Sequence, residues 1–120
     1  MTYQFRRSEE VKELYRKFGE EDAKQSVEDY RELLKIPAFR RVFAGILKRS
    51  RVFGSISYDS NDTNAVMKTV GFRELGVDIY MAANQADGQL VLTAISERNE
   101  LERARRARVD ALTNTEKKGN

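Results

Sequence analysis

The 120-residue chain contains no cysteine and no histidine. Without cysteine there is no disulfide framework, no thiolate metal site and no cysteine nucleophile, which fits a reducing compartment. Without either residue, Ser–His and Cys–His nucleophile pairs and the usual zinc ligand sets are excluded. The sequence sets no lysine or pair of carboxylates recognisably in an apolar pocket. We therefore expect a protein that is not an enzyme and that needs no cofactor and no metal.

Long apolar runs are missing as well. No run approaches the roughly 18 residues of a membrane span, and the first seven residues are polar and charged, unlike a signal peptide. We expect a soluble protein without membrane contact. One proline and seven glycines, with frequent Glu, Lys, Arg, Leu and Ala, favour mainly helical structure. The length allows one domain at most, and an apolar share of 40% predicts a modest core.

The net charge of +3 is unevenly distributed. Residues 33–58 carry six basic and no acidic groups, whereas residues 1–32 and 59–92 are net acidic and residues 93–120 carry +2. The basic block is therefore the only strong local field that the sequence predicts.

Hydrophobic periodicity predicts the first helices. Ser8 can cap a helix whose apolar residues between 11 and 18 recur at i, i+3, i+4 and i+7. Gly19 either ends or weakens this helix. The period resumes over residues 27–34 and stops before Pro37, which suits the first turn of a new helix.

The helix that begins at Pro37 has the clearest pattern. Its apolar stripe consists of Phe39, Val42, Phe43, Ile46 and Leu47. At about 100° per residue, the cations Arg40, Arg41 and Lys48 gather on the opposite face, and Arg51 joins them if the helix runs that far. This face is the best candidate for binding an acidic partner or nucleic acid, although a solvated or protein-facing role is the alternative. No aromatic side chain lies among the cations, which argues against base stacking.

The polar composition of residues 50–64 predicts a loop, in which Ile56 and Tyr58 could form a short β-like stretch. Asp62 or Thr63 is expected to cap the helix that follows. Its Asp- and Asn-rich run lacks the glycine and glutamate that a calcium loop needs at positions six and twelve.

The next helix, over residues 63–83, is apolar on two sides, which is typical of the central helix of a bundle. One stripe is Phe72, Leu75, Ile79 and Ala83, and the other is Val66, Val70, Val77 and Met81. We therefore predict an all-α fold, a small bundle of four to five helices around this central apolar helix.

Residues 84–88 predict a turn in which Asp87 caps a last helix that becomes charged after Ser96. The end of the chain, residues 113–120, has the composition of a disordered tail. The chain then divides into an N-terminal helical arm (1–26), a helical domain (27–101), and a charged helix end with the tail (102–120).

The segment Gly71-x-Arg73-x-x-Gly76 is unusual for a helix interior, where each glycine costs about 1 kcal/mol relative to alanine. Arg73 projects among valines, so its guanidinium needs a carboxylate or free carbonyls, or must extend outward. We expect a structural pin formed by Gly71, Arg73 and Gly76 that locks the preceding loop onto the helix; direct contact with a ligand or partner is the alternative. The candidate acidic partners of Arg73 are Asp29, Glu32, Asp59 and Asp62.

Several of these motifs together resemble a family of small bacteriophage proteins, the Bordetella-phage Bbp-nineteen-like phage domain. The resemblance covers residues 33 to about 100 and includes Leu33-Leu34 before a proline, Arg40-Arg41, Val52-Phe53, the Asn/Thr loop 61–64 and Gly71-x-Arg73-x-x-Gly76. Phe72 departs from the pattern, since such proteins often have a second arginine there.

The resemblance implies a phage protein, present in the host cytoplasm during infection or in the virion. It implies a virion-associated or assembly accessory that contacts phage structural proteins. The alternative is a helical module that binds nucleic acid through its basic face.

Overall fold

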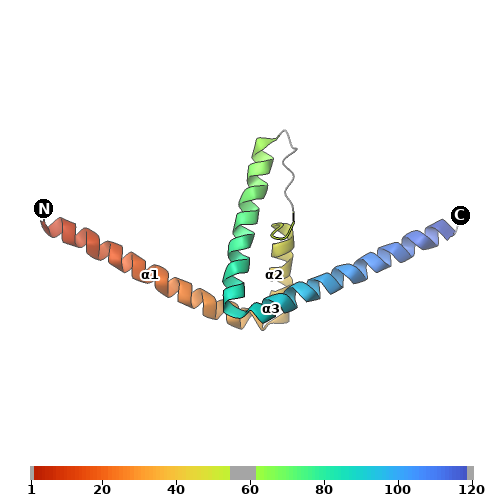
Figure 1. Cartoon of the computed structure of the whole chain (residues 1–120), viewed down its shortest axis with the longest axis horizontal. Helices are drawn as coiled ribbons and strands as arrows, with labels where there is room; N and C mark the ends of the chain where they lie inside the picture. Colours follow the sequence, from red (N-terminus) through yellow and green to blue (C-terminus); the bar gives the residue numbers. More distant parts are fainter. Residues whose placement is uncertain (1, 55–61, 119–120) are drawn as a thin grey trace.

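The computed structural model describes residues 2–54 and 62–118, and these residues form three α-helices (Figure 1). They are α1 (Thr2–Leu34), α2 (Pro37–Arg49) and α3 (Thr63–Lys118). The all-α class is confirmed. The β-like stretch expected at Ile56 and Tyr58 lies outside the described residues.

The expected count of four to five helices is wrong for two reasons. Helix α1 continues through Ser8 and Gly19 without a break. The turn expected at 84–88 is a kink within α3, where Asp87 alone leaves helical geometry with φ −161° and ψ 93°. The predicted cap is nonetheless present, because the N–H of Leu90 donates to Oδ1 of Asp87 at 3.0 Å.

The molecule is elongated and flat. Helix α2 and the first part of α3 run antiparallel as one pair, and α1 and the second part of α3 leave the base of that pair in different directions (Figure 1). The molecule measures 87 × 42 × 16 Å, with a radius of gyration of 22.0 Å. A compact chain of this length would have a radius of gyration of about 14 Å. The expected compact bundle is therefore wrong.

The core lies where the end of α1, helix α2 and the middle of α3 meet. Its buried members are Leu34, Phe43, Leu47, Val52, Ala83, Val91 and Ala94. Half-buried rings extend it, and those of Tyr30 and Phe39 meet edge to face at 6.4 Å. The core thus occupies only the centre of a long molecule.

The first part of α3 is not the enclosed central helix that its two apolar stripes predict. Ala83 is buried and Ile79 is half-buried, but Phe72, Leu75 and Met81 are all more than half exposed. The reason is that the 13-residue α2 covers this helix on one side, while α1 departs at the base (Figure 1).

Local capping explains where the helices begin. Ile36 is extended, with φ −89° and ψ 117°, and Pro37 occupies the first turn of α2, as expected. Oδ1 of Asp62 accepts the N–H of Ala65 at 3.2 Å and caps α3. At the other end, α3 continues to Lys118, so residues 113–118 are helical where a disordered tail was expected.

Helix α2 ends in a Schellman motif whose left-handed residue is Arg51, with φ 57°. The N–H of Val52 donates to the carbonyl of Leu47 at 3.2 Å, and the N–H of Arg51 donates to that of Lys48 at 3.1 Å. Val52 and Leu47 are both buried, which supplies the hydrophobic contact that accompanies this motif. Arg51 therefore belongs to the turn after α2 and not to the helix itself.

Candidate interaction surface

Gly76 is the member of the Gly71-x-Arg73-x-x-Gly76 segment that makes a close crossing. It is buried beneath the turn that follows α2. A Cβ atom placed on it would lie 2.6 Å from Cβ of Ser50 and 2.8 Å from Cγ2 of Val52. Ser50 is held there because its hydroxyl donates to the carbonyl of Ile46 at 2.8 Å. The absence of a side chain at position 76 therefore allows the turn to rest on α3.

The other two residues of the segment behave differently. Gly71 is exposed, and no described atom would lie within 4 Å of a Cβ placed on it. Arg73 is half-buried, and within residues 2–54 and 62–118 it forms no ion pair with the expected acids. Glu32 pairs instead with Lys35 on its own helix, and Asp59 lies outside the described residues. The pinning role of Arg73 stays a prediction.

The four cations expected on one free face are divided by the fold. Nε of Arg40 donates to Glu97 at 2.7 Å, and its Nη1 donates to the carbonyl of Leu34 at 2.8 Å. Only 14% of the Arg40 side chain is exposed. Arg40 therefore ties the end of α1, helix α2 and the second part of α3 together, which gives it a structural role.

Lys48 also points toward α3, where it pairs with Glu102. Arg98 approaches the same carboxylate at 2.9 Å. Hydrogen bonds from these two cations hold the pKa of Glu102 below its usual value, and the bond from Lys48 has the larger effect. Arg41 and Arg51 remain exposed and form no ion pair within the part of the chain that the structure describes. Among the described residues, two cations of the predicted basic face are thus left without an ion pair.

The N-terminal part of α1 presents an uncovered apolar stripe. Tyr15 is 71% exposed and Phe18 is 50% exposed, and Val11 and Leu14 on the same side are exposed to a similar degree. The Tyr15 and Phe18 rings meet edge to face with centroids 6.3 Å apart. Helices with such stripes normally bury them against another element.

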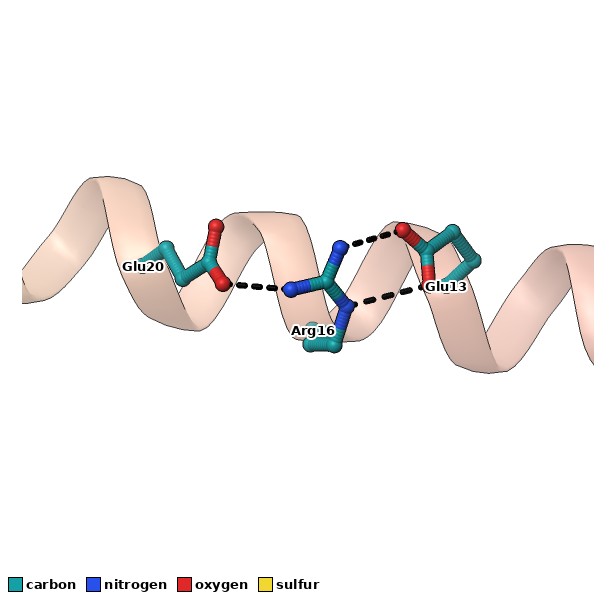
Figure 2. Close-up of polar contacts among 3 residues, drawn as sticks. All are labelled: Glu13, Arg16 and Glu20. Carbon is teal, nitrogen blue, oxygen red and sulfur yellow. Dashed lines mark hydrogen bonds and ion pairs between the residues drawn. The ribbon is translucent and has the colours of Figure 1, made fainter.

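The opposite side of this part of α1 is neutralised within the helix. The guanidinium of Arg16 lies between the carboxylates of Glu13 and Glu20 and donates to both (Figure 2). The contact with Arg16 lowers the pKa of Glu13. Arg16 on the polar side of the arm therefore has its partners within the same helix, whereas the described residues leave the apolar stripe uncovered.

A second uncovered apolar area lies on the pair formed by α2 and the first part of α3. Ile46, Phe72 and Leu75 surround a hollow of about 330 Å³ beside Gly76. Phe72 and Leu75 are two of the side chains whose burial the periodicity predicted and the fold does not provide.

The accessible surface of the chain reflects these uncovered areas. It amounts to 10001 Å². A compact monomer of 13.8 kDa would expose about 6,600 Å². The chain thus exposes roughly 3,400 Å² more than a compact fold of its mass.

Two chemical features are absent from the part of the chain that the structure describes. Its aspartate and glutamate residues form no group of three that could hold a metal ion. None of its helices combines the length and the apolar character needed to cross a bilayer.

Comparison with known proteins adds no relative: no family model, no curated protein and no solved structure matches this chain.

Proposed function

We propose that this chain is a non-enzymatic protein that acts by binding other proteins within an assembly. The observation that carries the proposal is the excess of exposed surface, together with the apolar stripe that α1 leaves uncovered. Large exposed apolar patches mark interaction sites in soluble proteins. The chain has the form of a component whose partners complete its core.

The kind of assembly is suggested by the sequence motifs. Their resemblance to small phage proteins supports a virion-associated or assembly accessory role, with phage structural proteins as partners. No family model matches the chain, so the phage origin rests on these motifs alone.

The test is quantitative mass spectrometry of purified particles and assembly intermediates from a phage that encodes this chain. We expect a constant copy number per particle or per intermediate. Leu14→Glu, which places a charge on the uncovered stripe, should be lost from these fractions. The exposed Lys24→Glu is the matched control and should be retained. Absence of the unaltered chain from both fractions would refute the proposal.

The alternative, a module that binds nucleic acid, has less support than the sequence suggested. Four phosphate contacts on duplex DNA would give a slope of about −3.6 for the logarithm of the binding constant against the logarithm of the salt concentration. The two cations of the basic face that form no ion pair among the described residues predict a slope of about −1.8. Binding to duplex DNA at two salt concentrations separates the two values. A slope near the larger value would favour nucleic-acid binding and would require Arg40 and Lys48 to leave their carboxylates.

A further inference from the structure

We propose that the N-terminal arm of one copy of this chain packs antiparallel against the C-terminal arm of a second copy. The N-terminal arm is residues 7–25 of α1, and the C-terminal arm is residues 103–116 of α3; every residue in both is exposed. The inference rests on the proposed function and names its partner, a second copy of this chain.

Within one copy the two arms cannot pair with each other. They leave the core in diverging directions, and the beginning of α1 and the end of α3 lie at opposite extremes of the molecule (Figure 1). Most of the stability of a helix in a protein comes from packing one apolar face against another element. Each arm therefore needs a partner from outside its own chain.

The C-terminal arm has an apolar stripe that can meet that of the N-terminal arm. At about 100° per residue, Val109 and Leu112 of the arm and Leu101 just before it fall within about 80° of one another around the helix. Val109 and Leu112 are among the most exposed apolar side chains, at 60% and 69%. If Val11 lies beside Leu112, an antiparallel arrangement also brings Leu14 beside Val109.

Charges at the ends of the two stripes favour this direction. The N-terminal stripe begins at Arg7 and ends at Asp22, and the C-terminal stripe carries Arg105 near its beginning and Glu116 near its end. None of these four side chains forms an ion pair within residues 7–54 and 62–116. With Val11 beside Leu112, the antiparallel register places Arg7 opposite Glu116, and it places Asp22 one helical turn from Arg105. A parallel register would place like charges together at both ends.

The surface of the whole chain is large enough for such contacts. A stable interface takes about 800 Å² from each partner. Because each copy offers one arm of each kind, it can form two such contacts. The roughly 3,400 Å² by which the whole chain exceeds a compact fold is more than these two contacts would bury.

The absence of cysteine makes a direct test possible. Leu14→Cys and Val109→Cys are prepared as separate variants of the full chain, mixed, and oxidised. We expect a mixed disulfide between the two variants, because such a bond requires Cα atoms within about 7 Å. Lys17→Cys, on the flank of the same arm, is the matched control and should link to Val109→Cys much less. Preferential linkage of Leu14→Cys to itself would overturn the proposal.

Charge reversal tests the register. Sedimentation equilibrium of the full chain should show self-association, and Asp22→Arg or Arg105→Asp alone should raise its Kd about fivefold. The chain with both changes should regain the original Kd. Circular dichroism of each variant checks that the arms remain helical.

Two results would refute the inference: a monomer at all concentrations, or self-association that neither charge reversal affects. A monomer that is still found in particles at constant copy number would leave the proposed function standing and remove only the self-pairing.

Discussion

The two glycines of the Gly71-x-Arg73-x-x-Gly76 segment form a matched pair for testing the contact between α3 and the turn after α2. Both lie in the interior of the same helix, so replacement by alanine gives each the same gain in helix propensity, about 1 kcal/mol. Gly71 has open space around it, whereas Gly76 faces Ser50 and Val52. The difference between the two variants therefore isolates the steric cost at Gly76.

That steric cost can be estimated from the contacts. A Cβ atom at position 76 would come within 2.6 Å of Ser50 Cβ and 2.8 Å of Val52 Cγ2, both closer than real Cβ contacts. Neither neighbour can move easily, because the Ser50 hydroxyl is bonded to α2 and Val52 is buried in the core. Inserting a methyl group into such a site costs about 1–3 kcal/mol.

We therefore expect Gly71→Ala to raise the free energy of unfolding by up to about 1 kcal/mol. The free energy of unfolding of Gly76→Ala should be about 1–3 kcal/mol lower than that of Gly71→Ala. Urea denaturation followed by circular dichroism measures both values under the same conditions. If Gly76→Ala proves as stable as Gly71→Ala, the turn does not rest on the helix as described and the reasoning fails.

Three further predictions concern single residues. Arg51→Gly should stabilise the chain by about 1 kcal/mol, because glycine adopts the positive φ of the Schellman turn without strain; a lower urea midpoint would contradict this. Asp87→Ala should destabilise it by about 1 kcal/mol through loss of the cap on the N–H of Leu90, and Asp87→Asn should retain most of the stability; equal midpoints for the two variants would show that the cap is unimportant. The lowered pKa of Glu102 means that its stabilising contribution is complete above its ordinary value of 4.5 and is lost as the pH falls through the lowered folded-state value. A pH series of unfolding curves should therefore be flatter below pH 4.5 for Glu102→Gln, and identical pH profiles would refute the assignment.

The sequence predicted the helix boundaries that depend on local chemistry. Pro37 begins α2, Asp62 caps α3, and Asp87 caps its second part, because each signal acts on backbone groups within three residues. The break suspected at Gly19 is absent. One glycine in a helix interior costs about 1 kcal/mol relative to alanine. The ion pairs of Arg16 with Glu13 and Glu20 on the same helix partly offset that cost.

The arrangement of the helices could not be predicted in the same way. Two apolar stripes on residues 63–83 indicate which faces avoid water, but not whether the chain supplies enough helix to cover them. One short helix covers one side, so Phe72 and Leu75 remain exposed. Similarly, the spacing of Arg40 along α2 reveals its face on that helix but not that Glu97, 57 residues later, returns to meet it.

The kink at Asp87 connects this local chemistry to the elongated shape. In an unbroken helix the carbonyl of Ala86 would accept the N–H of Leu90, but that N–H donates to the Asp87 carboxylate. The Ala86 carbonyl instead accepts from Nε of Arg31 on α1 at 3.4 Å. The break that redirects the second part of α3 is thus joined to the helix that carries the other arm. Both arms leave the core beside this kink. The cap at Asp87 and the small core therefore together determine how far apart the arms extend, and hence which surfaces a partner can reach.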